Sequence, residues 1–218
     1  FTSSPILALT GSNGKTTTIH LLHEMCISDG RTSLLGGNVG IPFSENVLWE
    51  LTSNINSPVH VLELSSFQLE HVQLFSPTIC GILNISPDHM DRYENFDVYV
   101  TKKLKLAEQT QQSGCVVYNA DDPILAQSLA DIPHSVQFSL TQNPDCHFKL
   151  NASKVYTGED ENPNILFELK DTKLKGLHNL QNILAAATMA HTFDLSSSAI
   201  QDTIINFTPI HHRLEWIG

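Results

Sequence analysis

The segment TGSNGKTTT at positions 10–18 constrains the fold of this chain more than any other. It follows a short apolar run at 5–10 and precedes Ile19, Leu22 and Cys26, which recur at helical spacing. A strand, a glycine-rich loop and a helix in that order are typical of a phosphate-binding loop, in which backbone N–H groups and the helix dipole face the phosphate oxygens. The sequence therefore predicts a nucleotide-binding α/β fold.

Two residues of this loop have separate expected roles. Lys15 would reach the outer phosphates, and the hydroxyl of Thr16 would hold Mg²⁺. The match is to the shorter pattern GxxGK[ST], because Leu9 stands where the eight-residue pattern has glycine. An ordinary glycine-rich turn would give no reason for Gly-Lys-Thr in this register. The loop residues expected to bind ATP are Gly11, Ser12, Asn13, Gly14, Lys15, Thr16 and Thr17.

The rest of the chain alternates between short apolar runs and segments of helical period, which predicts a parallel sheet. The apolar runs lack polar alternation, so both faces of the sheet should be covered by helices. The further strands are expected at 33–35, 60–64, 78–85, 115–119 and 135–140. The helices are expected at 43–51, 66–73, 97–112 and 122–130, and later around 180–187 and 196–206.

Between these two sets, residues 146–177 read as four short strand-like pieces, HFKLNA, KVYTG, ILFELK and TKLKG, separated by Gly, Asn and Pro. We therefore expect an α/β fold with a mostly parallel sheet, helices on both faces and a small antiparallel sheet appended.

Composition excludes several classes of protein. With 218 residues, 41% apolar and 16% charged, the chain is neither disordered nor fibrous. Its formal net charge of −11 argues against a nucleic-acid or anionic-membrane surface. The four cysteines lie far apart without a CxxC pair, which favours reduced thiols in a cytoplasmic protein. No apolar run approaches the ~18 residues of a membrane span. As a separate expectation, the protein should be a monomer.

Two further segments follow strands and should reach the same edge of the sheet. Glu63 ends one apolar run, where a carboxylate could bind the metal of a nucleotide or simply cap a helix. His89 follows another run, in DHMDRY, where it could bind a metal or phosphate, oriented by Asp88 or Asp91. Most histidines do neither, so the sequence leaves both readings open.

Three other patterns also have two readings. Lys102, Lys103 and Lys105 would usually form a solvated helix face, and a lysine turned toward a metal would need to be neutralised or modified. Asn179 and Asn182 share a helix face, where they could cap the helix or contact a base. The glycines of GGNVG at 36–40 could form a turn or allow a close approach to a ligand.

Taken in order, the motifs resemble the central ATP-binding domain of the Mur ligase family, the ATP-dependent enzymes that form amide bonds in peptidoglycan precursors. The motifs that carry this resemblance are TGSNGKTT, GGNVG, ELSSFQLE, NISPDHMDRY, YVTKKL, NADD, GLHNLQN and HHRLE. ELSSFQL and DHMDRY are similar to the branch that adds D-glutamate, whereas other branches and the folylpolyglutamate synthases differ there.

The resemblance implies an acyl-phosphate mechanism. ATP would phosphorylate the carboxylate of UDP-N-acetylmuramoyl-L-alanine, and the amine of D-glutamate would then attack the mixed anhydride. Because carboxylate and triphosphate repel each other, Lys15 and Mg²⁺ would have to neutralise the developing charge.

The resemblance also implies roles for single residues. Thr16 and Glu63 would bind one Mg²⁺, and His89 the second, with Lys103 as a carbamylated lysine whose modification turns a cation into a carboxylate-like ligand. Lys15, His89 and Lys103 would be the catalytic residues. Positions expected near the muramoyl substrate are Asn38, Ser65 and Gln68; near adenine, Asn179 and Asn182; near the phosphates from the hinge, His212 and Arg213.

The same resemblance predicts how the chain is organised. Residues 1–208 would be the central domain and 209–218 a hinge leading into a truncated C-terminal domain, with the N-terminal UDP-binding domain absent. Such a fragment should be inactive alone. The alternatives are another Mur-type or folylpolyglutamate-synthase-like ligase, a kinase, or a non-catalytic P-loop nucleotide-binding module.

Overall fold

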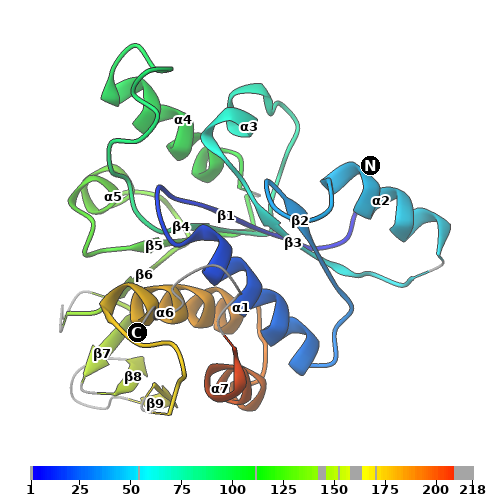
Figure 1. The fold of residues 1–218 in the computed structure, drawn as a ribbon, viewed down its shortest axis with the longest axis vertical. Coiled ribbons are helices and arrows are strands. Elements are labelled where there is room, and N and C mark those ends of the chain that lie inside the picture. The colour runs from blue at the N-terminus through cyan, green and yellow to red at the C-terminus, as the bar shows by residue number, and fades with distance from the viewer. Residues whose placement is uncertain are drawn as a thin grey trace, which may run out of the picture.

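The computed structural model describes residues 2–208 except 54, 111, 142–145, 152, 158–163 and 170, and its centre is a single nine-stranded sheet (Figure 1). The strand order is β2-β3-β1-β4-β5-β6-β7-β8-β9. The strands are β1 Ile6–Thr10, β2 Ser33–Gly37, β3 Val59–Glu63, β4 Ile79–Ile82, β5 Cys115–Asn119, β6 Ser135–Ser139, β7 Phe148–Asn151, β8 Lys154–Thr157 and β9 Asn164–Glu168.

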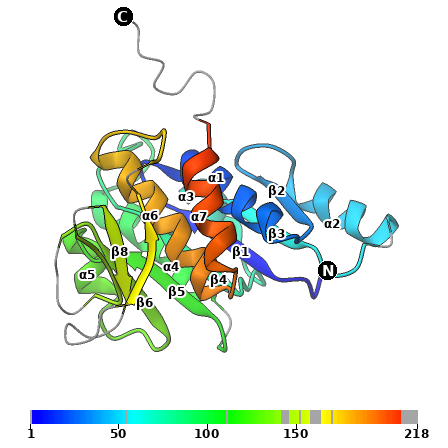
Figure 2. The same ribbon diagram turned by 90° about the horizontal axis from the view of Figure 1, so that it is seen from below.

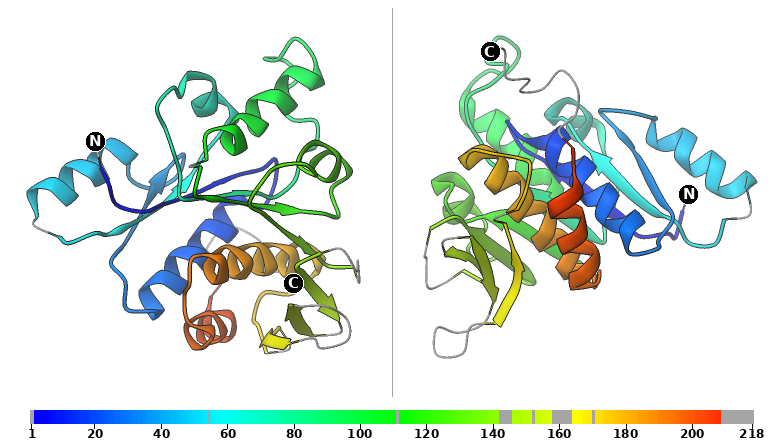
Figure 3. Two further views of the ribbon diagram at one scale, coloured as in Figure 1. Left: turned by 180° about the vertical axis from the view of Figure 1, so that it is seen from behind. Right: turned by 60° about the horizontal axis from the view of Figure 1, so that its bottom comes forward.

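Helices cover both faces of this sheet, as the lack of polar alternation in the strands predicted (Figure 3). One face carries α1, α6 and α7, and the other carries α3, α4 and α5, with α2 beside β2. The helices are α1 Lys15–Ser28, α2 Phe43–Thr52, α3 Ser66–His71, α4 Phe96–Glu108, α5 Pro123–Ser128, α6 Leu177–Thr192 and α7 Ser197–Asn206. The strands and helices expected outside residues 146–177 are therefore present, with ends that differ by a few residues.

The topology creates a reversal of strand order at β1. The chain passes from β1 to β2 and back to β3 on one side, and then crosses to β4 on the other side. The strands from β2 through β7 are parallel, so their carboxyl ends meet at one edge of the sheet. Ligands of open α/β sheets bind in the crevice outside such a reversal, and the phosphate loop follows β1 there.

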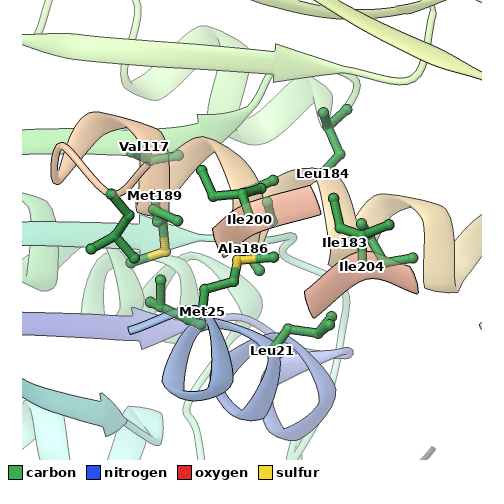
Figure 4. Close-up of a cluster of buried hydrophobic side chains, with 14 of the residues drawn as sticks. Leu21, Met25, Val117, Ile183, Leu184, Ala186, Met189, Ile200 and Ile204 are labelled. Carbon is green, nitrogen blue, oxygen red and sulfur yellow. The ribbon is translucent and has the colours of Figure 1, made fainter. Parts of the chain in front are cut away.

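The larger apolar core lies where α1, α6 and α7 meet the sheet (Figure 4). Leu21 and Met25 of α1 belong to the same buried cluster as Ile183 and Met189 of α6. α6 and α7 lie side by side in the view from below (Figure 2), and both contact α1. A Cβ at Gly81 in β4 would lie 2.5 Å from Met189 Sδ, so α6 packs directly on the backbone of the central strands.

The antiparallel strands expected at the end of the sheet are confirmed, and they continue the main sheet. β7 pairs parallel with β6, and β8 and β9 follow antiparallel. The prediction of a fourth strand in TKLKG is wrong, because residues 172–176 form an irregular connection to α6. Leu174 is buried there while its N–H donates to Thr172 Oγ1 at 3.2 Å, a local contact that replaces a strand partner.

The sequence predicted reduced cysteines and no membrane-spanning segment, and the structure bears on both predictions. The four cysteines are all free thiols. Within the described part of the chain, no helix combines the length and apolar character that a membrane crossing requires. The predicted hinge at 209–218, including His212 and Arg213, lies outside the described residues.

Candidate functional site

The phosphate loop lies at the reversal of strand order and opens directly into α1. Gly14 precedes the helix with a φ of 83°, a left-handed conformation that glycine adopts without strain. No side chain caps the first turn of α1, and this turn contains no acidic residue. The positive end of the helix dipole therefore faces this loop without a negatively charged side chain of its own turn to offset it.

Residues after β4 hold this loop in place. Ser12 N–H donates to Asn84 O at 3.0 Å, and Asn13 N–H donates to Asn84 Oδ1 at 2.8 Å. Asn84 Nδ2 returns a bond to Asn13 O at 3.1 Å, so one amide side chain satisfies both backbone groups of Asn13. Ser86 contacts Ser12 through backbone N–H and C=O. The loop is thus fixed by the segment that contains DHMDRY.

The structure brings together three of the predicted residues around one buried carboxylate. Glu63 is 2% exposed, and its Oε2 accepts a hydrogen bond from Thr16 Oγ1 at 2.9 Å. Its Oε1 accepts from Asn38 Nδ2 at 3.0 Å, and its backbone oxygen accepts from Asn38 N–H at 2.7 Å. A hydroxyl and a carboxylate oxygen side by side fit the hard-oxygen preference of Mg²⁺.

Within the described ranges, no group of three or more His, Cys, Asp or Glu side chains could hold a metal ion. Thr16 and Glu63 would hold a Mg²⁺ ion that is also bound by the phosphate oxygens of a nucleotide. The donor set fits a nucleotide-bound ion better than an ion caged by protein alone.

Two lysines converge on the loop. Lys15 Nζ donates to Gly11 O at 2.8 Å and to Ser12 O at 2.9 Å, while Lys103 Nζ donates to the same Gly11 O at 2.8 Å. Lys103 is 2% exposed and comes from α4, whereas its neighbour Lys102 is only partly buried. The lysine that turns inward is therefore Lys103, and the two lysine amines share one carbonyl oxygen beside the phosphate site.

Burial, followed by the charge of Lys15, lowers the pKa of Lys103 from 10.5 to about 7, while Asp88 acts in the opposite direction. Between these values the folded protein has released a proton that the unfolded chain keeps. The free energy of unfolding should therefore rise with pH from about 7 toward 10. Between pH 7 and 9, we expect the free energy of unfolding of the protein without substitutions to rise by about 1–2 kcal/mol more than that of Lys103→Met.

Urea unfolding in CO₂-free buffer would measure this gain, with Lys102→Met as the matched control on the same helix. The control should keep the pH slope of the unmodified protein. Parallel curves for the unmodified protein and Lys103→Met would contradict the prediction.

Asn179 and Asn182, both buried, line a cavity of about 370 Å³ together with loop and helix residues. Asn182 lies against the loop, since a Cβ at Gly14 would be 2.2 Å from its Oδ1. Asn179 Nδ2 donates to Lys175 O at 2.9 Å, and Gly176 at the N-cap position offers no side chain. The two amides face a cavity beside the phosphate loop, and neither caps an N–H group of α6.

Three other predicted residues have local contacts. Ser65 and Gln68 form the capping box at the start of α3, in which each side chain bonds the backbone of the other. His89 is about half exposed, with Nε2 3.5 Å from Asp88 Oδ2 and its ring 5.0 Å from that of Phe67. The roles of these three residues toward substrate or metal stay predictions.

The glycines at 36 and 37 are explained by packing against protein. A Cβ at Gly36 would lie 2.2 Å from Ile41 O, and one at Gly37 would lie 2.2 Å from Glu63 O. Gly37 also has a φ of 102°. The close approach that these glycines allow is therefore between β2 and its neighbours, and it brings Asn38 onto Glu63.

Sequence reasoning missed Asn84, Ser86 and Tyr99, whose contacts fix the loop. The signal was present for two of them, since Asn84 and Ser86 follow a buried strand at the expected edge. Tyr99 begins the motif YVTKKL, but nothing in that motif distinguishes it from a core residue of a helix.

Comparison with known proteins agrees with this geometry. Residues 9–190 match the family described as the Mur ligase middle domain. The chain is similar to "UDP-N-acetylmuramoylalanine--D-glutamate ligase" of Geotalea daltonii, with 36% identity over 220 residues, 100% of this chain and 47% of that protein. The protein with the same description from Thermoanaerobacter sp. is 32% identical over 219 residues, with the same coverage. The chain thus spans about half the length of these curated relatives.

Solved structures give the same fold. A structure described as UDP-N-acetylmuramoyl-L-alanyl-D-glutamate–2,6-diaminopimelate ligase superposes with a TM-score of 0.78 at 21% identity, over 98% of this chain and 48% of that one. MurF from Acinetobacter baumannii superposes with a TM-score of 0.75 at 19% identity and the same coverage. At these identities the likeness concerns the fold alone.

Proposed function

Because the chain belongs to the Mur ligase family, we propose that it is the ATP-binding part of a ligase that joins D-glutamate to UDP-N-acetylmuramoyl-L-alanine. The similarity of the whole chain to relatives described as that ligase supports this choice of substrates. In this proposal the chain is part of a longer protein, whose other domains hold the uridine nucleotide and D-glutamate. That protein would be a monomer and would work in the cytoplasm.

One observation carries the chemistry: the ammonium group of Lys15 donates to the carbonyl oxygens of Gly11 and Ser12, beside the start of a helix that no side chain caps. The reaction requires a carboxylate to attack the γ-phosphoryl group of ATP, and both reactants are anionic. Positive charge fixed in advance at this point lowers the repulsion and stabilises the charge that develops in the transition state.

The roles of the other residues follow from their positions. Thr16 and Glu63 would hold the Mg²⁺ of the nucleotide, and that ion would supply Lewis-acid stabilisation of the phosphoryl oxygens. Asn179 and Asn182 would contact adenine in the adjacent cavity, and Asn38, Ser65 and Gln68 would face the muramoyl substrate. Lys15 would stay close to the phosphoryl group as it passes from ATP to the carboxylate, which leaves ADP. The amine of D-glutamate would then attack the carboxyl phosphate, and the amide bond would form as phosphate leaves.

We further propose that Lys103 is carbamylated and, with His89, serves a second Mg²⁺. Its amine is buried beside the loop, where an added carboxylate would offset the charge of Lys15. A ¹³C-bicarbonate NMR spectrum should show a carbamate signal that Lys103→Met loses and Lys102→Met keeps. A signal that survives Lys103→Met would rule out this site of modification.

The reaction is tested on the full-length protein by phosphate release from ATP with UDP-N-acetylmuramoyl-L-alanine and one amino acid at a time. Release that requires D-glutamate is the expected result. Release with another amino acid, or with a folate acceptor, would indicate another Mur-type or folylpolyglutamate-synthase-like ligase. Transfer to an acceptor without an amino acid would indicate a kinase.

The same assay separates an enzyme from a non-catalytic nucleotide-binding module. In a ligase, His89→Ala and Lys103→Met should lose turnover while ATP still binds. ATP binding without turnover in the unmodified protein would support the module instead.

A further inference from the structure

Tyr99 of α4 reaches the phosphate loop from a distant part of the chain. It is 1% exposed, and its hydroxyl oxygen lies 2.9 Å from Ser12 Oγ, 87 positions away in the sequence. Ser12 Oγ also donates to Ser86 O at 3.0 Å and accepts from Ser86 N–H at 2.9 Å. A hydroxyl has one proton to donate, so with that proton on Ser86 O, Tyr99 must donate to Ser12.

The ring of Tyr99 has a second contact at the same site. Lys103, one helical turn later, places Nζ 4.8 Å from the centre of this ring while it donates to Gly11 O. The ring therefore limits where the amine of Lys103 can lie beside the loop. Tyr99 thus contacts the loop through its hydroxyl group and supports a loop-bound lysine through its ring.

Neighbouring aromatic side chains hold this ring still. Tyr93 packs edge-on against it with centroids 5.3 Å apart, and Phe96 stacks on it at 6.2 Å. Since the ring cannot turn away without moving these neighbours, the direction of its hydroxyl group is fixed before a nucleotide arrives.

We propose that Tyr99 is a positioning residue for nucleotide binding, which holds Ser12 and Lys103 in the arrangement that the triphosphate requires. This inference rests on the proposed function of the loop as the ATP site. Without the hydroxyl group, the loop would populate its binding-competent form less, and saturating ATP would restore it. The effect should therefore fall on KM for ATP and not on kcat.

Tyr99→Phe removes only the hydroxyl group, and Tyr118→Phe is its matched control. Tyr118 is also 1% exposed in the same core, and its hydroxyl group accepts a bond from Gln137, away from the loop. In the full-length protein we expect Tyr99→Phe to raise KM for ATP about fivefold, with kcat within about twofold. Both substitutions should lower the midpoint of thermal unfolding by similar amounts, but Tyr118→Phe should leave KM for ATP unchanged.

Ser12→Ala tests the same bond from the other side, so the result does not depend on one variant folding. Combined with Tyr99→Phe, it should raise KM less than the product of the two single effects, because both remove one shared contact. The proposal is overturned if Tyr99→Phe leaves KM unchanged, if Tyr118→Phe raises KM equally, or if the two effects multiply. Failure of the unmodified protein to turn over ATP would instead overturn the proposed function.

Discussion

Replacement of Lys15 by methionine is expected to lower kcat/KM for ATP at least about 100-fold. In the structure its ammonium bridges Gly11 O and Ser12 O, so it already lies over the loop that would hold the phosphates. Methionine keeps most of the length of the side chain and removes the charge. The chain has a net charge of −11, so overall charge does not attract a triphosphate to it.

Phosphate release by the full-length protein, with ATP binding followed by calorimetry, would measure the loss. Lys173→Met is the matched control, because it removes an equal charge from an exposed lysine whose Nζ donates to Asn206 O, away from the loop. The control should change kcat/KM less than about twofold. Equal losses in the two variants would mean that net charge, and not the position of Lys15, governs binding.

Replacement of Gly37 by alanine should destabilise the protein by about 3–5 kcal/mol, the second large effect that we expect. The added Cβ would lie 2.2 Å from Glu63 O, and backbone atoms of a paired strand cannot move aside as a flexible side chain can. The residue also has a φ of 102°, where alanine is strained. Because Asn38 bonds the same Glu63, Mg²⁺-dependent ATP binding should weaken as well.

Gly30→Ala separates these two causes. Gly30 has a φ of 79°, but no atom lies within 4 Å of an added Cβ, so only backbone strain remains. Its cost should be about 1 kcal/mol, measured by urea unfolding alongside Gly37→Ala. Equal destabilisation by the two substitutions would show that the approach of β3 to β2 contributes nothing.

The sequence predicted what local signals encode. Gly14, Lys15 and Thr16 specify a loop between strand and helix by residue type alone, and the loop is found there. The apolar runs predicted a sheet covered on both faces, because a strand buried on both sides has no polar alternation. A strand in TKLKG was predicted wrongly, since strand pairing depends on a partner that a short segment does not identify.

The candidate site was predictable only in part. Parallel strands share one edge, so Thr16 and Glu63 could be expected near each other, and their side chains are 2.9 Å apart. The capping box of Ser65 and Gln68 is also a local pattern, and the role of these residues toward the substrate stays a prediction.

The choice between adjacent lysines shows the limit. Lys102 and Lys103 have the same chemistry and adjoining positions, and only the packing of α4 on the sheet buries one of them against Gly11. The amphipathic period of a helix says which face is apolar, but a long lysine can extend from that face to solvent or fold inward.

By itself, then, the sequence determined the phosphate loop, the order of strands and helices and the family resemblance, because each rests on residues close together in the chain. The tertiary structure alone decided that Tyr99 meets Ser12, that Lys103 shares a carbonyl oxygen with Lys15, and that Gly37 lies against Glu63. These contacts join segments 26 or more positions apart, and their geometry follows from the packing of whole elements, which no local pattern of residues specifies.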